Sequence, residues 1–356
     1  MEAVFSAKPA TFWGSVEPGD KAWLRLIEQS ADALPFHRPE WLEVLSSSYG
    51  FRPFVLGVSE VPGELEAGLP LLEVKDPIRG RRWVALPFTD RCPPLQSSSA
   101  AGEQLAAGLD EARREAGVRR LDVRARVKGP GLATGMAAVT HLLGLTRDYE
   151  AVERSFSSST RRNLRKAQRE DLSVRSADSE DDLVRVFYDL HERTRRRLGV
   201  PVQPRRFFRE LWRQGLERGL GHALIVLHSG RPVAAGVFLV CGKTVVYKFG
   251  ASDARSWELR PNNVLLAEAI RYACESGAEM FDFGRSDLPD SGLRRFKTSW
   301  GAVEEPLVYT SAGGRSAETQ PRLAASVPGR AASAMLRRAP LWVGRALGSA
   351  MYRYAA

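Results

Sequence analysis

Residues 282–301 read DFGRSDLPDSGLRRFKTSWG and pass from the end of a strand through a polar loop into a short basic helix. Phe296 and Trp300 stand four positions apart, so they share one apolar stripe of that helix. Lys297 lies at the edge of the stripe, whereas the two arginines before Phe296 lie further round the helix. We therefore expect Lys297 to be partly withdrawn from water, either as a positioned charge for a phosphate or oxyanion or as a stem that packs along aromatic rings.

The sequence before this stretch predicts a unit of alternating strands and helices. Two-residue turns at Ser229-Gly230 and Gly242-Lys243 join three strands into an antiparallel meander. A helix with Pro261 near its start follows, and a strand then delivers Asp282 to the loop. The predicted order is helix 155–170, strand 172–176, helices 179–199 and 205–219, strands 222–229, 231–240 and 244–252, helix 261–277, strand 279–283 and a final strand 305–310 that closes the unit.

The first 150 residues predict another mixed α/β unit. Strands are expected at 53–60 and 81–88, followed by an amphipathic helix at 100–117 and a strand at 120–127. The glycine-rich segment 129–135 lacks the strand–loop–helix order of a nucleotide-binding loop, so phosphate binding there is the less favoured interpretation.

The length, composition and net charge of the chain agree with two soluble domains and an anionic partner. The chain has 356 residues, of which 44% are hydrophobic and 26% charged, and a domain commonly has about 150 residues. The net charge of +10 favours nucleic acid, a nucleotide, phospholipid or a phosphorylated substrate, and a basic surface without a ligand stays open. Three cysteines without a CxxC pair support neither a disulfide framework nor a zinc ribbon, which predicts a reducing, cytoplasmic setting and no metal. We expect no signal peptide and no membrane-spanning helix, because apolar runs of the required length are missing.

Three clusters are candidates for chemistry, and the first is basic. Seven basic residues and two acids lie between Arg154 and Arg175. Arg161, Arg162 and Lys166 stand near a predicted helix start, where backbone N–H groups add to their charge, so they are suited to a polyanion. A solvated charged face is the alternative.

The second cluster combines the end of a meander strand with the helix start that follows it. Its candidate binding residues are Tyr247, Lys248, Arg260, Asn262 and Asn263. Tyr247 and Lys248 point to opposite faces of their strand, and the helix start can hold an anion or orient a carbonyl. The third cluster is the opening stretch, with Asp282, Arg285 and Lys297.

The segment from Arg315 to the C-terminus is expected to be a basic helical tail, with seven arginines and one acid. Pro340 can open a helix that carries an apolar stripe with Arg345 opposite. Such a helix either lies on an anionic membrane surface or docks on its own protein. The residues of the stripe are Val343, Leu347, Ala350, Met351 and Tyr354.

Four motifs, in their order, resemble those of the Fem-type aminoacyltransferases and of their bacterial relatives called FemAB-like or BioF2-like acyltransferases. The resemblance covers residues 150–310 well and the first 150 residues loosely. The motifs are Thr160-Arg161-Arg162-Asn163-Leu164-Arg165-Lys166-Ala167, Tyr247 with Gly250-Ala251-Ser252, Pro261-Asn262-Asn263, and Asp282-Phe283-Gly284 followed by Gly292-Leu293-x-x-Phe296-Lys297-x-x-x-Gly301.

The resemblance implies an α/β fold of two tandem GNAT-like domains with mixed central sheets flanked by helices. The order of elements after residue 150 is itself the layout of a GNAT-type acyltransferase domain, although no internal repeat is visible in the sequence. We expect a degenerate GNAT-like domain over residues 1–150, the acyltransferase domain over 151–314, and the basic helical tail over 315–356.

The resemblance also implies an activity, since the best-known members transfer an amino acid from aminoacyl-tRNA to an amine of a peptidoglycan precursor. Lys297 is then expected to stabilise a phosphate or oxyanion, and Asp282 to orient or deprotonate the amine. Arg285 joins the substrate-binding residues of the second cluster, and the basic cluster holds the phosphates of the donor. No tightly bound cofactor and no metal are expected.

Two departures keep other functions open. The chain lacks the helical insertion of some cell-wall members, and it also lacks the acetyl-CoA loop Arg/Gln-x-x-Gly-x-Gly/Ala of ordinary GNAT enzymes. One alternative is an N-acyltransferase that uses acyl-CoA or an acyl carrier protein in polysaccharide or natural-product synthesis. Another is a non-catalytic module that binds nucleic acid or a membrane. The expected location is the cytoplasm, including the inner face of the membrane if the tail binds lipid.

Overall fold

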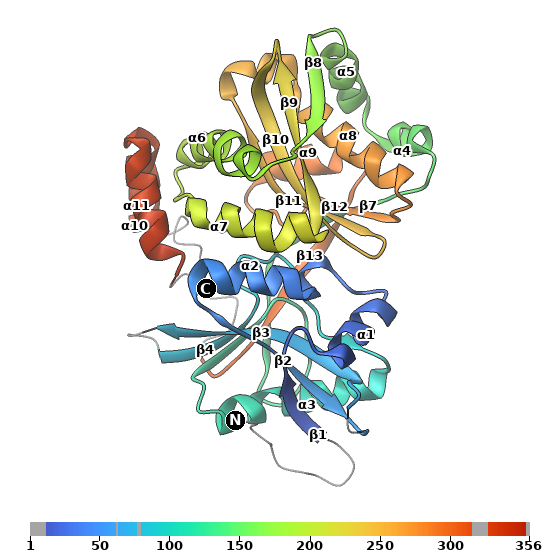
Figure 1. Ribbon diagram of the computed structural model, residues 1–356, viewed down its shortest axis with the longest axis vertical. Helices are drawn as coiled ribbons and strands as arrows, with labels where there is room; N and C mark the ends of the chain where they lie inside the picture. Colours follow the sequence, from blue (N-terminus) through green and yellow to red (C-terminus); the bar gives the residue numbers. More distant parts are fainter. Residues whose placement is uncertain (1–11, 62, 77–79, 315–326, 354–356) are drawn as a thin grey trace. The chain divides into compact units, whose positions relative to one another are not determined.

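The computed structural model describes residues 12–61, 63–76, 80–314 and 327–353, which divide into two compact units (Figure 1). Unit 1 contains Met1–Ala138, Pro306–Gln320 and Tyr352–Ala356, and unit 2 contains Val139–Glu305 and Pro321–Met351. The division falls inside two strands, at residues 138/139 and 305/306, whereas the predicted borders are at residues 150 and 314.

The strands are β1 (Phe12–Val16), β2 (Arg52–Ser59), β3 (Ala67–Asp76), β4 (Gly80–Ala85), β5 (Leu95–Gln96), β6 (Arg120–Val123), β7 (Ala133–Gly144), β8 (Leu172–Ser176), β9 (Gly221–His228), β10 (Arg231–Cys241), β11 (Thr244–Ser252), β12 (Met280–Asp282) and β13 (Val303–Ala312). The α-helices are α1 (Lys21–Gln29), α2 (Pro39–Tyr49), α3 (Ser99–Glu115), α4 (Tyr149–Ser155), α5 (Ser158–Ala167), α6 (Tyr188–Leu198), α7 (Arg205–Glu210), α8 (Pro261–Glu275), α9 (Ser291–Thr298), α10 (Val327–Arg338) and α11 (Leu341–Met351). Two π-helical turns, Asp182–Phe187 and Leu211–Gly215, adjoin α6 and α7.

The two units repeat one order of elements. In unit 2, β8 and the helices α6 and α7 precede the antiparallel meander β9–β10–β11, and α8 leads to β12, which pairs in parallel with β11. In unit 1, β1 and the helices α1 and α2 precede the meander β2–β3–β4, and α3 leads to β6, which pairs in parallel with β4. The expected α/β class with mixed sheets and flanking helices is therefore confirmed.

The strand that follows each repeat in the sequence pairs with a strand of the other repeat. β7 follows the first repeat, yet its Leu142–Gly144 end pairs antiparallel with β12. β13 follows the second repeat, yet its end pairs antiparallel with β6, with Thr310 opposite Val123. The prediction that strand 305–310 closes the second unit is therefore wrong, and β7 was not predicted at all.

Local sequence explains the meander and the core of unit 2. Ser229 and Gly230 adopt φ of 46° and 75°, the left-handed pair that a tight hairpin between β9 and β10 requires. α8 buries an apolar stripe that includes Leu265, Ala269 and Ile270 against the sheet, and these residues belong to the core of this unit. In Figure 1, α6 and α8 lie on opposite sides of β9 and β10.

The predicted segment 155–170, a Ser/Thr cap cluster followed by a helix, contains α5, and the separate helix α4 precedes it. α4 ends at Ser155, and the Ser157 hydroxyl accepts a hydrogen bond from the Thr160 amide at 3.2 Å, which starts α5 afresh. The break places the basic segment on its own short helix.

The tail folds into α10 and α11, which contact α6 within unit 2. Arg345, predicted to lie opposite the apolar stripe, is instead part of the docked face, because its guanidinium binds the buried Glu192 carboxylate of α6 with two hydrogen bonds, one of them at 3.1 Å. Leu347 of the predicted stripe is exposed, and Tyr354 lies outside the described residues. Among the helices of the described residues, none combines the length and the apolarity needed to cross a membrane.

Candidate active site

Lys297 is buried on α9 and binds the backbone of a neighbouring loop. Asp290 starts the helix by accepting a hydrogen bond from the Leu293 amide at 3.0 Å. The Lys297 side chain is only 5% exposed, and its Nζ donates to the carbonyls of Gly284 at 2.8 Å and Arg285 at 2.9 Å. The ammonium therefore clamps the loop that follows β12.

Trp300 explains why large aromatics surround this lysine. The indole is fully buried and packs edge-on against Phe156 at 5.0 Å between ring centroids, with Phe283 and Phe296 each 6.3 Å away. Phe283 opens the loop after β12, Phe296 belongs to α9, and Phe156 lies just before α5. The rings therefore fix α9 relative to the loop and to α5.

The loop 283–286 is bonded to β7 at both of its ends. The Phe283 amide donates to the His141 carbonyl at 2.9 Å, and Ser286 exchanges two hydrogen bonds with Val139, at 2.8 and 3.0 Å. The carbonyls between these ends are the ones that Lys297 binds. The backbone of the loop is thus held by the sheet at its ends and by the lysine in its middle.

Asp282 turns the chain from β12 into this loop. Its Oδ1 accepts hydrogen bonds from the Gly284 amide at 2.7 Å and from the Thr140 hydroxyl at 2.8 Å, and the side chain is 4% exposed. Gly284 has φ of 72°, a conformation that favours glycine. The carboxylate therefore acts as a turn cap, and its role as a base stays a prediction.

Arg285 forms an ion pair with Asp287. Its Nη2 and Nε lie 2.9 and 3.2 Å from Asp287 Oδ1. An anionic ligand would have to compete with this carboxylate for the guanidinium.

β11 and β12 separate next to the loop. They pair over Thr244–Val246 and Met280–Asp282 only, although β11 continues to Ser252. Beyond Asp282 the chain follows β7 instead, through the bridge between Val139 and Ser286. The ladder between β11 and β12 therefore ends just before Tyr247 and Lys248.

Tyr247 and Lys248 stand at an irregularity of β11. Val237 of β10 is opposite Phe249 and Phe238 is opposite Tyr247, so Lys248 is the extra residue of a bulge. Tyr247 packs against the core and stacks on Phe238 at 5.3 Å, and burial raises the pKa of its hydroxyl. The half-buried Lys248 Nζ lies 5.5 Å from the Phe249 ring centroid.

The start of α8 joins the end of β11. Asn262 Nδ2 donates to the Ser252 hydroxyl at 3.2 Å, and Asn263 is buried. Arg260 caps the helix with a left-handed φ of 61°, and its side chain is exposed. Of these three residues, Arg260 is the one that a ligand can reach most readily from solvent.

The basic helix α5 is attached to the end of α9. The Thr160 hydroxyl donates to the Ser299 carbonyl at 3.0 Å, and the Ser157 amide donates to the same carbonyl at 2.8 Å. The Arg161 guanidinium is committed to the carbonyls of Arg154 and Phe156. Arg162 and Lys166, by contrast, are exposed and stand one turn apart on one face.

Sequence reasoning missed a polar group beside Lys297. His141 is fully buried on β7, and its Nε2 lies 3.3 Å from Glu304 Oε2. Arg294 of α9 binds both Glu304 oxygens, at 2.8 and 2.7 Å, and this pairing lowers the Glu304 pKa. Burial, followed by the charge of Lys297, lowers the His141 pKa, so the imidazole is neutral at pH 7. No sequence motif marks His141, because its position depends on a strand that was not predicted.

No group of three or more His, Cys, Asp or Glu side chains that could hold a metal occurs in the described part of the chain.

Comparison with known proteins gives a family match that includes this region. Residues 154–298 match the family model described as "Acetyltransferase (GNAT) domain". A search of curated proteins finds no match.

Similar solved structures include FemX, with a TM-score of 0.66 and 15% identity over 83% of this chain and 96% of that chain. L-PGS from Bacillus licheniformis has a TM-score of 0.53 and 12% identity over 93% and 97% of the two chains. N-myristoyltransferase from Saccharomyces cerevisiae has a TM-score of 0.50 and 12% identity over 88% and 85%. These likenesses show a shared fold, and the family match identifies residues 154–298 as a GNAT-type acetyltransferase domain.

Proposed function

We propose that this chain, an acyltransferase with a GNAT domain over residues 154–298, transfers an aminoacyl group from aminoacyl-tRNA to an amine acceptor. The acceptor class that we favour is a cell-wall or related precursor. The observation that carries the proposal is the attachment of an exposed basic helix, α5, to the end of the helix that holds Lys297. A polyanionic donor bound along α5 would bring its acyl end toward the Lys297 loop.

The charge distribution on α5 supports a polyanion rather than a single phosphate. Arg162, Arg165 and Lys166 of α5 are exposed, as is Arg169 just beyond its end, and the segment Ser157–Gln168 contains no acid. Several exposed cations along one helix release several counterions when a nucleic-acid backbone binds. Since Arg161 is bound to local carbonyls, we assign it to shaping the helix start, while Arg162 and Lys166 contact the donor.

The proposed chemistry is attack by an amine on the ester carbonyl, with tRNA as the leaving group. The enzyme positions the two substrates and stabilises the oxyanion of the tetrahedral intermediate. Lys297 supplies a fixed positive charge in a site with little water, and it holds the 283–286 loop at the point where β11 and β12 separate. Asp282 keeps the turn in place through its hydrogen bond from the Gly284 amide. Anionic groups of the acceptor are bound by Arg285, Lys248 and Arg260.

A thioester donor is the second candidate. The matching family model is described as an acetyltransferase domain, and the N-myristoyltransferase that shares this fold was solved with bound myristoyl-CoA. In this alternative an acyl-CoA or acyl carrier protein replaces the tRNA, and the leaving group is a thiol. With either donor, we propose that the reaction takes place in the cytoplasm.

The test is a transfer assay with both donor classes and two α9 variants. Labelled aminoacyl-tRNAs and an acyl-CoA panel are offered with a panel of amines, and label transfer and thiol release are measured. We expect transfer from charged tRNA, a loss of turnover of about a hundredfold or more in Lys297→Met, and little change in Arg295→Met, which alters an exposed residue of the same helix. Thiol release without transfer from tRNA would replace the first candidate by the second.

A further inference from the structure

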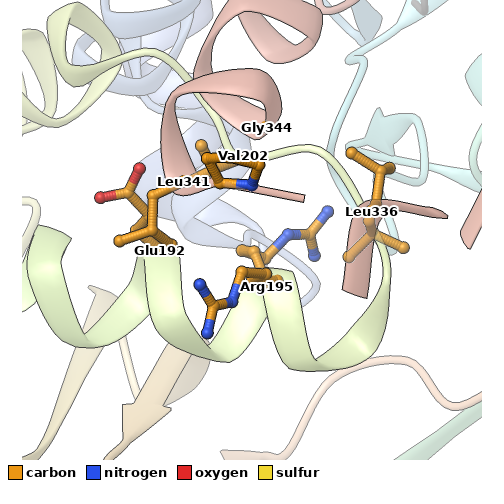
Figure 2. A pocket seen from close by; sticks show the side chains of 9 residues that line it. Glu192, Arg195, Val202, Leu336, Leu341 and Gly344 are labelled. Atoms are coloured by element: carbon orange, nitrogen blue, oxygen red, sulfur yellow. The ribbon is translucent and has the colours of Figure 1, made fainter. Parts of the chain in front are cut away.

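The tail helices use one face to dock on unit 2. Leu336 is buried, and Gly348 lies so close to the Val202 carbonyl that an added Cβ would clash with it. Figure 2 shows Leu336, Leu341 and Gly344 of the tail around a small hollow with Glu192, Arg195 and Val202. The Arg345–Glu192 ion pair closes the same seam. The docked face is therefore defined by apolar contact, close backbone approach and one ion pair.

The opposite face of the tail is apolar and exposed. Met335 of α10 is 75% exposed and Trp342 of α11 is 65% exposed. Trp342, Ala346 and Ala350 are exposed at successive turns of α11, so they form one stripe. Large apolar side chains at this level of exposure, gathered on two consecutive helices, indicate a surface that meets a partner.

The charged side chains that α10 and α11 themselves carry are of one sign. Arg337 and Arg338 at the end of α10 are exposed, and residues 327–353 contain no Asp or Glu. Arg345 forms the ion pair with Glu192 on the docked side, whereas Arg337 and Arg338 are exposed on the free side of the tail. The partner is therefore expected to be both apolar and anionic.

We propose that the outer face of α10 and α11 binds the surface of an anionic lipid bilayer. An indole, a thioether and small apolar side chains can enter the boundary between head groups and acyl chains, while the arginines contact phosphates. Nucleic acid fits less well, because a stacking surface needs several aromatic rings and Met335 and Ala346 offer none. Contact would hold unit 2 at a membrane face, and it does not depend on the donor of the acyl reaction.

The test is co-sedimentation of the full chain with vesicles. Vesicles of phosphatidylcholine with phosphatidylglycerol are compared with phosphatidylcholine alone, at several salt concentrations. We expect binding to the anionic vesicles only, weakened by salt. Arg337→Ala with Arg338→Ala should weaken it by about thirtyfold, and Trp342→Ala by about tenfold.

Matched variants separate the tail from general effects of charge and apolarity. Arg206→Ala with Arg231→Ala removes two exposed arginines of unit 2 outside the tail, and Tyr272→Ala removes an exposed aromatic ring. Both should bind vesicles as the wild type does, and circular dichroism should show all variants folded. The proposal would be overturned if the chain did not bind vesicles, or if the control variants lost binding equally. It would also be overturned if Arg337 and Arg338 were needed for binding tRNA but not for binding vesicles.

Discussion

Replacing Lys297 with methionine is expected to release the loop 283–286 from the sheet of unit 2. Methionine keeps most of the length of the side chain but leaves the Gly284 and Arg285 carbonyls without their donor. Water cannot readily take its place, since Lys297 is 5% exposed. Each hydrogen bond from a charged group contributes about 1.5–3 kcal/mol, and extra apolar burial offsets about 1 kcal/mol, so the net local loss is about 2–5 kcal/mol.

Hydrogen exchange reports this loss at the loop itself. The Phe283 and Ser286 amides donate to the His141 and Val139 carbonyls, so they exchange only when the loop opens. A loss of about 3 kcal/mol in opening free energy makes their exchange roughly a hundredfold faster, because about 1.4 kcal/mol is tenfold. Amides of the β9–β10 hairpin should be unaffected.

Arg295→Met is the matched control, because Arg295 is exposed on the same helix. It should leave the exchange of both amides within about threefold of the wild type, since surface substitutions usually change stability by less than about 0.5 kcal/mol. If Lys297→Met also stays within this range, or if both variants accelerate exchange equally, the clamp by Lys297 is refuted.

Three other predictions concern separate parts of the chain. Gly301→Ala should lower the free energy of unfolding by about 1–3 kcal/mol in a urea titration, because a left-handed φ is unfavourable for alanine. At Gly301 φ is 78°, and the new Cβ would lie 2.5 Å from Ser155 Oγ. Gly292→Ala, in the same helix region with its nearest outside atom at 3.8 Å, should be neutral or stabilising, and equal losses in both variants would contradict this reading. Burial lowers the His191 pKa from its usual 6.5 to about 3, so the folded state binds fewer protons and stability is lost as pH falls from about 6.5 towards 3. His191→Gln should therefore lose about 2 kcal/mol less than the wild type between pH 7 and pH 5 in urea titrations, and parallel losses would count against it. Arg162→Ala with Lys166→Ala should reduce the slope of log affinity against log salt for tRNA by about 1–2, whereas Arg337→Ala with Arg338→Ala should not; an unchanged slope in the first pair would exclude phosphate contacts there.

Much of unit 2 was predictable because its elements carry local signals. The paired turn residues Ser229-Gly230 specify the hairpin, and helical spacing of apolar residues specifies α8. The spacing of Phe296, Lys297 and Trp300 predicted that this lysine would be withdrawn from water, and its side chain is buried. The spacing could not predict that the ammonium binds the Gly284 and Arg285 carbonyls, because every residue has a backbone carbonyl and no side chain marks these two.

The features that were missed depend on contacts between distant parts of the chain. β7 reads as an irregular mixture of small and apolar residues, so its pairing with β12 and the place of His141 beside Lys297 were not visible. The partner of β13 is set by β6, far away in sequence, and no local pattern reports it. Arg345 was placed on the wrong side of its helix because a buried acid on α6 outweighs the apolar periodicity of α11.

A competition between two donors in one reaction tests whether aminoacyl-tRNA is the acyl donor of this enzyme. Aminoacyl-tRNA carrying one radiolabel and acyl-CoA carrying another are mixed with the wild-type enzyme and an amine acceptor, and the label on the product amide is counted. We predict that the aminoacyl label reaches the amine, and that Lys297→Met reduces this transfer by about a hundredfold or more while Arg295→Met retains it. Product that carries only the acyl-CoA label, with stoichiometric release of free thiol, would contradict it.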